Sequence, residues 1–416
     1  MSTLRETAGT PRTLSDLLLG LRRVAAGRAD LLRAVGPGRT ETLSTSDFLR
    51  QVHSLAVALE ARGLRAGDRV ALLAENRPEW HGVDFACHLL AAPTVPLDPE
   101  TSAERVGFAL RNSGARWIFY GDKRHRDLLS ELAGSLTSSP LAVAMDGAAA
   151  PAAGGAAAGM PSLTRLQGEG AERLAEVPLE RFRERAKAED LATLVYPGET
   201  TDLEGVRISH GEAVARVEAC GRALNARGGI GPEDRVLSFL PLAEDFQRTF
   251  GYLCFLRGAS ISYLPDRERL AAALAAEKPT VLTADPAEYG RAHRLLLKNL
   301  DQLPLWTRGL LGWALGAGER YAEALTRGPA GPRLALEGRL AHRVARRWAQ
   351  AGFGGRLRLA LIAPPPSASL DGGDPEDAAA TARFFAAAGL PLCREPDLNG
   401  ATPAQSAPAE SSSRLA

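Results

Sequence analysis

The sequence predicts an α/β fold in which mainly parallel sheets are covered by helices. Short apolar segments with the length of buried strands alternate with longer segments whose apolar residues recur at helical spacing. This alternation favours parallel sheets with helices on both faces, because a crossover between parallel strands usually contains a helix. Strands are expected at residues 69–73, 94–97, 117–120, 236–240, 260–264, 280–283 and 357–362, and helices at 79–91 and 103–112.

The N-terminal part adds two expected helices. Leucines at helical spacing predict an amphipathic helix over residues 14–35. Ser44 or Thr45 can cap the next helix, because a side-chain oxygen at this position accepts a bond from a free backbone N–H. That helix should end at Gly63 and bury one apolar face, made of Phe48, Val52, Leu55, Ala56 and Leu59.

Composition restricts the classes of function. The 416 residues suffice for two subdomains with large cores. With 50 basic and 49 acidic residues the net charge is +1, so we expect no nucleic-acid partner. The four cysteines form no close pair, which argues against a disulfide framework or a cysteine metal site. Because there is no signal-type segment and no apolar run of about 18 residues, a cytoplasmic protein is expected.

Composition also predicts the boundaries along the chain. Residues 147–159 contain only Ala, Gly and Pro, which are too small to pack a core. We therefore expect a flexible N-terminus (1–12), a first α/β subdomain segment (13–145), a low-complexity linker with a helical connector (146–187), a second α/β subdomain (188–400) and a disordered tail (401–416).

One segment suggests a functional loop. Residues 196–206 read Tyr-Pro-Gly-Glu-Thr-Thr-Asp-Leu-Glu-Gly-Val. A loop that holds a nucleotide triphosphate needs glycines, which let backbone N–H groups face the phosphates, and a lysine. Thr200, Thr201 and Gly205 suit such a loop, but three other positions are acidic and none is Lys or Arg. The same residues also suit a solvated acidic turn between a strand and a helix.

Five stretches, in this chain order, resemble the adenylate-forming superfamily of acyl-CoA synthetases, adenylation domains and luciferases; they are 67–80, 95–99, 190–211, 234–242 and 354–358. The strings Glu-Asn-Arg-Pro-Glu-Trp and Leu-Ser-Phe-Leu-Pro-Leu are most similar to the long-chain fatty acyl-CoA synthetase branch. The resemblance implies the large N-terminal domain of these enzymes, with two stacked α/β subdomains and mainly parallel sheets. The family's C-terminal lid domain, which carries a catalytic Lys, has no counterpart here and is expected to be absent.

Members of this family use ATP and Mg²⁺ to form an acyl-adenylate and then transfer the acyl group to a thiol. Their phosphate loop reads Tyr-Thr-Ser-Gly-Thr-Thr-Gly-x-Pro-Lys-Gly-Val, one residue longer than the segment here. Acidic residues stand where the family has glycines and its lysine. The matching positions, and hence the candidate nucleotide-binding residues, are Tyr196, Thr200, Thr201 and Gly205.

Three further family motifs are altered. Leu240-Pro-Leu-Ala-Glu244 lacks the Ser-His pair, and Ile362-Ala-Pro-Pro-Pro366 replaces the adenine-binding Ser-Gly-Gly-Ala-Pro. Pro396-Asp-Leu-Asn-Gly400 lacks the Thr and Glu that serve phosphate and Mg²⁺ in the family. Prolines remove N–H donors and fix φ, so the adenine site is expected to be blocked. We therefore expect no catalytic residue, no metal site and no cofactor.

The leading hypothesis is an acyl-CoA synthetase-like pseudoenzyme that has lost ATP-dependent acyl-adenylate formation and binds or regulates in fatty-acid metabolism. Its partner would be a fatty acid, an acyl-CoA, an active synthetase or another protein. The alternative is an active long-chain fatty acid–CoA ligase, or another carboxylate-activating enzyme, with a rebuilt loop or a separately encoded lid domain. That enzyme would use ATP and Mg²⁺. A third hypothesis is an expressed fragment without a selected function.

Three aromatic residues are candidates for an acyl pocket. Phe246 follows the altered Leu-Pro-Leu motif, at a position that the family resemblance matches. Trp306 and Trp313 are seven residues apart in a helical segment and can face an acyl chain or a membrane surface. A role in the core is favoured for both tryptophans, because aromatic stripes usually pack inward.

Two other groups leave alternatives open. The basic segment 339–347 admits peripheral membrane contact, or a solvated face with Leu340, Val344 and Trp348 packed inward. His81, Asp84 and His88 have helical spacing and admit a metal site. Because a close His-x₃-His pair is lacking, surface or capping histidines are favoured. His210 is expected to pack beneath the loop that precedes it.

Overall fold

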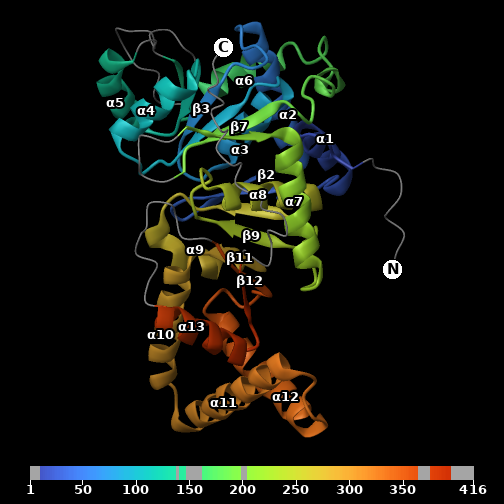
Figure 1. Ribbon diagram of the computed structural model, residues 1–416, viewed down its shortest axis with the longest axis vertical. Helices are drawn as coiled ribbons and strands as arrows, with labels where there is room; N and C mark the ends of the chain where they lie inside the picture. Colours follow the sequence, from blue (N-terminus) through green and yellow to red (C-terminus); the bar gives the residue numbers. More distant parts are fainter. Residues whose placement is uncertain (1–9, 137–139, 147–161, 198–203, 364–374, 395–416) are drawn as a thin grey trace, which may run out of the picture.

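Two stacked sheets organise the protein (Figure 1). The computed structural model describes residues 10–136, 140–146, 162–197, 204–363 and 375–394. Residues 1–9 of the predicted N-terminus (1–12), residues 147–161 of the predicted linker (146–187) and the predicted tail 401–416 lie outside these ranges. Within them, the two mixed α/β layers confirm the predicted fold class.

The smaller sheet consists of β3 (Val70–Leu73), β4 (Thr94–Leu97), β5 (Trp117–Tyr120), β6 (Leu141–Ala144), β7 (Leu191–Val195) and β8 (Val206–Ser209). Their order across the sheet is β6-β5-β3-β4-β7-β8. All neighbours pair in parallel except β7 and β8, which form an antiparallel hairpin.

The larger sheet consists of β1 (Leu32–Val35), β2 (Thr40–Leu43), β9 (Arg235–Ser238), β10 (Ser260–Tyr263), β11 (Val281–Ala284), β12 (Leu359–Ile362) and β13 (Leu392–Arg394). Their order is β13-β12-β11-β9-β10-β1-β2, and only β1 and β2 are antiparallel.

The two sheets do not follow the predicted segment boundaries. β1 and β2, from segment 13–145, join the sheet formed by the later strands. Conversely, β7 and β8, from segment 188–400, complete the sheet of the first segment through β4. Each sheet therefore contains strands from both sides of the connector at residues 146–187.

Helices fill the space between and around the sheets. They are α1 (Leu14–Val24), α2 (Thr45–Ala61), α3 (Pro78–Leu89), α4 (Ala103–Ser113), α5 (Lys123–Leu132), α6 (Leu163–Ala171), α7 (His210–Asn225), α8 (Asp245–Arg257), α9 (Leu270–Glu277), α10 (Pro286–Asp301), α11 (Leu305–Arg327), α12 (Pro332–Ala351) and α13 (Pro375–Ala387). Helix α3 contacts strands of both sheets, so it joins the two layers, and α8 packs beside it against α1, α7 and β10.

The position of strand β3 inside the smaller sheet explains why its sequence is apolar throughout. Val70 and Leu72 face the main core, whereas Ala71 and Leu73 face a second, smaller core with residues of α4. A strand of a parallel sheet is covered on both faces, so alternation between polar and apolar residues is lost. The mostly apolar runs at 94–97 and 117–120 are fully buried for the same reason, and the structure confirms both predicted strands.

The predicted helix over residues 14–35 is wrong in its second half. Helix α1 ends at Val24, and Leu32–Val35 forms strand β1. Gly27 has φ of +70°, a left-handed conformation that glycine adopts at little cost and that ends the helical path. The backbone N–H of Gly36 then donates to the Arg39 carbonyl at 3.0 Å and turns the chain into the β1–β2 hairpin.

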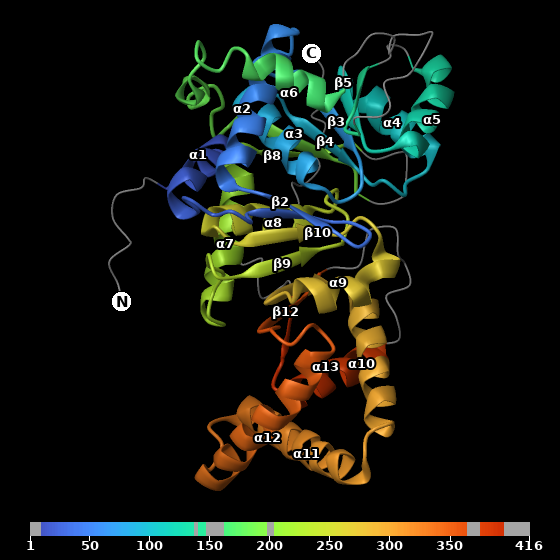
Figure 2. The ribbon, with the colours of Figure 1, turned by 180° about the vertical axis from the view of Figure 1, so that it is seen from behind.

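Helices α10 to α13 form the end of the molecule beyond the larger sheet, with α11 and α12 farthest from the smaller sheet (Figures 1 and 2). Helix α11 packs against α12 and α13, and α10 packs against α13. None of the helices in the described ranges is long and apolar enough to cross a bilayer. Cys87, Cys220, Cys254 and Cys393 are buried, and none of them forms a disulfide in the described ranges.

Candidate functional site

The candidate loop connects the two strands of the β7–β8 hairpin. Val195 pairs with Val206, so the chain leaves the sheet after Val195, at the carboxyl end of β7. Ligands commonly bind at this edge in parallel α/β sheets. Thr200 and Thr201 fall within 198–203, outside the described residues, and the two flanking candidates, Tyr196 and Gly205, are placed.

Tyr196 is held against helix α4. Its hydroxyl donates to Asn112 Oδ1 at 2.8 Å, and its ring packs edge-on against Phe108 with centroids 5.9 Å apart. The backbone carbonyl of Tyr196 accepts a bond from Arg105 Nη2 at 3.3 Å. The contacts of this side chain therefore anchor the first residue of the loop to the neighbouring helix.

Gly205 is required for close packing at the other end of the loop. A Cβ atom here would lie 2.8 Å from Leu194 Cδ1 and 3.0 Å from the Tyr196 ring. Its φ is outside the left-handed region. The packing of Leu194 and Tyr196 thus accounts for glycine at this position without any phosphate contact.

The altered Leu-Pro-Leu segment is tied to the smaller sheet by Asn76. The amide nitrogen of Asn76 donates to the Leu240 carbonyl at 2.7 Å and to Ser238 Oγ at 3.2 Å. Its amide oxygen accepts from the Leu242 N–H at 3.2 Å. One buried side chain therefore fixes the connection from β9 to α8 against the connection from β3 to α3.

The three acyl-pocket candidates do not lie together. Phe246 is buried in α8, where its ring stacks on Phe250 with centroids 6.2 Å apart. Trp306 and Trp313 lie on α11, which packs against α12 and α13 and not against α8. Their exposed fractions of 74% and 44% contradict the favoured core role. The inner face of α11 is made of Leu311 and the small residues Ala314, Ala317 and Gly318, and both tryptophans lie outside it.

Sequence reasoning missed a buried polar network centred on Asp84. The Asp84 carboxylate accepts from Thr94 Oγ1 at 2.8 Å and from the Tyr252 hydroxyl, and lies 3.3 Å from His88 Nε2. These residues come from α3, β4 and α8. The expectation that His81 and His88 lie at the surface is wrong, because both are fully buried. Large apolar residues surround helix α3, and all of its residues except Glu79 are buried, which was the available signal that its polar residues must find partners inside.

The predicted alternative of a metal bound by His81, Asp84 and His88 is not supported. His81 turns away from Asp84, and its Nδ1 lies 2.9 Å from the Tyr263 hydroxyl. Its ring is surrounded by aromatic side chains, among them Phe255 at a centroid distance of 5.1 Å. The three side chains therefore do not converge on one point.

Burial decides the protonation of this region. Burial lowers the pKa of His81 to about 4, and burial together with the charge of His88 lowers the pKa of His210 to about 3. Burial alone would raise the pKa of Asp84, but His88 and Arg248 lower it below its ordinary range. Both His81 and His210 are thus neutral at pH 7, and Asp84 is ionised. His210 packs behind α1, with Nδ1 accepting from the Leu14 N–H at 3.3 Å.

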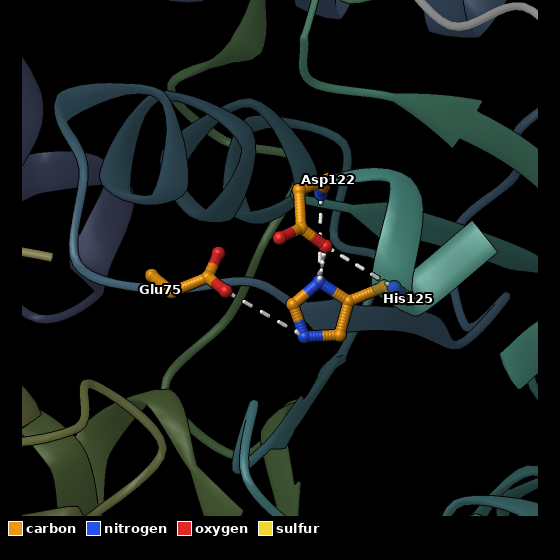
Figure 3. Close-up of side chains that lie close together, drawn as sticks. All are labelled: Glu75, Asp122 and His125. Carbon is orange, nitrogen blue, oxygen red and sulfur yellow. Dashed lines mark hydrogen bonds and ion pairs between the residues drawn. The ribbon is translucent and has the colours of Figure 1, made fainter. Parts of the chain in front are cut away.

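Another cluster has the composition of a metal site. Glu75, Asp122 and His125 come within 4.8 Å of one another, the only such group in the described ranges (Figure 3). However, His125 Nδ1 accepts from the Asp122 N–H as part of the α5 capping box, and Nε2 lies 3.2 Å from the Pro99 carbonyl. Because both ring nitrogens are already bonded within the protein, the imidazole serves as a helix cap.

Two cavities have linings that do not include the placed residues of the candidate loop. One, of about 550 Å³, is an open groove beside α4 and α5, lined in part by Lys123 and Arg124. The other, of about 340 Å³, lies between α1, α2 and the connector and includes Leu49, His53 and Leu179. Neither is lined by Tyr196, Gly205 or Phe246.

A comparison of this chain with known protein families identifies its family. A family model described as AMP-binding enzyme matches residues 21–325, well over half of the chain. The chain belongs to the AMP-binding enzyme family. This AMP-binding family match confirms the resemblance that the sequence motifs indicated, and it includes the β7–β8 loop, the β9–α8 segment and the Asp84 network.

Named members of the AMP-binding family are similar over part of their length. The long-chain-fatty-acid–CoA ligase FadD15 of Mycobacterium bovis is 27% identical over 328 residues, which are 78% of this chain and 52% of that protein. The peroxisomal long chain acyl-CoA synthetase 7 of Arabidopsis thaliana is 30% identical over 268 residues, 62% of this chain and 36% of the relative. The chain therefore spans about half the length of FadD15.

Solved structures of AMP-binding enzymes have the same fold. A long-chain-fatty-acid–CoA ligase, FadD1, from Archaeoglobus fulgidus gives a TM-score of 0.56 at 16% identity, covering 71% of this chain and 55% of its own. The anthranilate CoA ligase AuaEII, in complex with anthranoyl-AMP, gives 0.57 at 21% identity, covering 70% and 53%. These likenesses establish the fold shared with acyl-CoA synthetase-like enzymes.

Proposed function

We propose that this AMP-binding family member no longer forms an acyl-adenylate and acts in the cytoplasm as a binding or regulatory protein of fatty-acid metabolism. One observation carries the proposal: the segment after β7 is acidic and contains no Lys or Arg. Its ligand would be a fatty acid or an acyl-CoA, and its protein partner an active synthetase. The named relatives, which are fatty-acid ligases, supply the ligand class.

Electrostatics opposes polyphosphate binding at this loop. Glu199, Asp202 and Glu204 lie within residues 196–206. Two unit charges about 4 Å apart interact by about 4 kcal/mol at an intermediate effective dielectric. Replacing one attractive contact by a repulsive one therefore removes several kcal/mol of affinity. The donor set of this loop does not fit ATP with Mg²⁺.

The placed residues of the loop support the same proposal. The Tyr196 hydroxyl donates to Asn112. Gly205 has no side chain and so leaves room for the Leu194 side chain. Contacts with α4 explain Tyr196, and packing on Leu194 and Tyr196 explains Gly205. A scaffold that keeps its fold while its ligand contacts change is a common route by which one fold acquires another role.

Calorimetric titration with ATP and MgCl₂ tests the proposal, and we expect no binding. A variant with Glu199→Gln, Asp202→Asn and Glu204→Gln removes the three negative charges and should raise ATP affinity. The matched control, Glu172→Gln, Glu176→Gln and Glu184→Gln, makes the same charge change at exposed connector positions and should leave it unchanged. ATP binding by the unaltered chain, with carboxylate-dependent exchange of pyrophosphate into ATP, would refute the proposal.

The alternative is a carboxylate-activating enzyme with a rebuilt loop, and one observation favours it. Arg105 reaches the Tyr196 carbonyl, and its guanidinium forms no ion pair with any carboxylate that the structure places. This bond holds a cation beside the first residue of the loop. Pyrophosphate exchange that is lost in Arg105→Gln and kept in Arg111→Gln, on the same helix, would establish this alternative.

A further inference from the structure

Helix α12 has two faces of different chemistry. Its inner face is made of small buried residues, Gly338, Ala341, Ala345 and Ala349. The opposite face, at helical spacing, is exposed and combines two leucines with three arginines: Leu336, Arg339, Leu340, Arg343 and Arg347. Leu340 is 49% exposed, so the expectation that it packs inward is wrong, whereas Val344 and Trp348 do pack against the core.

The three arginines of this face carry uncompensated charge. None of Arg339, Arg343 and Arg347 lies within ion-pair distance of a carboxylate in the described part of the chain, although Arg320 pairs with Glu337 at 3.0 Å. The hairpin formed by α11 and α12, residues 305–351, contains eight arginines and three glutamates, with no Lys or Asp. Its net charge is therefore +5, in a chain whose total is +1.

Helix α11 exposes a row of large apolar side chains. Trp306, Leu310 and Trp313 follow one another at i, i+4 and i+7, with exposed fractions of 74%, 44% and 44%. Leu305, at the start of the helix, is 84% exposed. Most exposed large apolar side chains of the described chain belong to this hairpin or to the preceding α10.

The hairpin lies at one end of the molecule (Figures 1 and 2). It contacts the rest of the chain mainly through α13, so its outer surfaces remain accessible. We propose that the α11–α12 hairpin docks on an anionic lipid bilayer. Its arginines would bind headgroup phosphates, and the two tryptophans would enter the interfacial layer, where amphipathic rings are favoured.

Charge selects lipid over a second copy of this chain. Two hairpins in contact would each bring a net charge of +5, so self-association through this surface is opposed by repulsion. An anionic bilayer instead supplies negative charge opposite the arginines and an apolar layer for the tryptophans. Lipid binding does not depend on whether the family's nucleotide chemistry survives, so it goes beyond the proposed function.

Co-sedimentation of the whole protein with vesicles tests the inference. Vesicles of phosphatidylcholine mixed with phosphatidylglycerol should bind it, pure phosphatidylcholine should bind it weakly, and added salt should release it. The variant Arg339→Gln, Arg343→Gln, Arg347→Gln should lower the partition coefficient about 100-fold, since each basic residue contributes a factor of about five. The matched control, Arg111→Gln, Arg173→Gln, Arg183→Gln, makes the same charge change on exposed positions elsewhere and should bind normally.

Tryptophan fluorescence gives a second, independent readout. Brominated lipids should quench Trp306 and Trp313, and the Trp306→Ala, Trp313→Ala variant should lose most of that quenching, because Trp80 and Trp117 are buried and Trp348 packs against the core. Failure of the protein to sediment with anionic vesicles would overturn the inference. So would equal binding by the hairpin and control variants, or sedimentation equilibrium that shows a dimer abolished by the hairpin variants.

Discussion

Acid should destabilise the protein through a buried histidine. His81 is fully buried among aromatic rings, with Tyr263 near Nδ1 and no hydrogen-bond partner at Nε2 in the described structure. Burial lowers its pKa to about 4, from an ordinary value of 6.5. The unfolded chain therefore takes up this proton near pH 6.5, whereas the folded protein does not take it up until about pH 4.

The sign and the size of the pH effect on the free energy of unfolding follow from this difference in pKa. Between about pH 6.5 and about pH 4 the unfolded state binds more protons, so the free energy of unfolding falls as the pH falls. At about 1.4 kcal/mol per pH unit, His81 alone accounts for a loss of about 3 kcal/mol. Its contribution is complete above pH 6.5 and falls no further below about pH 4.

Urea denaturation at a series of pH values measures this loss. His81→Gln removes the titrating group. Between about pH 6.5 and about pH 4, the free energy of unfolding of this variant should therefore fall by about 3 kcal/mol less than that of the unaltered protein. The control Phe85→Leu destabilises the same aromatic cluster without removing a proton site and should keep the full slope. An unchanged slope in His81→Gln would mean that this imidazole is not held neutral, and the reasoning would fail.

Two predictions concern packing and the buried network. Asp84→Ala should lower the free energy of unfolding by about 3–5 kcal/mol, because buried partners lose their acceptor, while Thr94→Val should cost about 1 kcal/mol; a urea-melt loss below about 1 kcal/mol for Asp84→Ala would contradict the network. Gly170→Ala should cost more than about 2 kcal/mol, since its Cβ would lie 1.8 Å from the Ser54 carbonyl oxygen. Gly168→Ala, in the same helix with open space around it, should instead stabilise by about 0.5–1 kcal/mol, so equal melting temperatures of the two variants would refute this packing.

Local sequence predicted those elements whose pattern has a single explanation. The strands Thr94–Leu97 and Trp117–Tyr120 are short, mostly apolar runs that stop at Asp98 and Gly121, so their limits followed directly. Residues 14–35 failed because the apolar residues of β1 continue the helical spacing of α1. The distinction depended on Gly27 and on pairing with β10, which lies far along the chain.

The candidate site was predictable only in part. Motif spacing identified the loop and its change of charge, but it could not show that Tyr196 bonds to Asn112 or that Gly205 packs on Leu194. The Asp84 network was missed because Tyr252 lies 168 residues away in sequence. Polar residues on a buried helix indicate that hydrogen-bond partners exist, but only the tertiary fold shows which residues these partners are.

The exchange of strands between the two sheets has a consequence for any break of the chain between β6 and β7. The N-terminal polypeptide would carry β3 to β6 without β7 and β8, and also β1 and β2 without the strand β10 beside which they fold. The C-terminal polypeptide would carry the converse set. Neither piece holds a finished layer, so a nicked molecule should remain assembled, and separately made halves should become structured only when mixed.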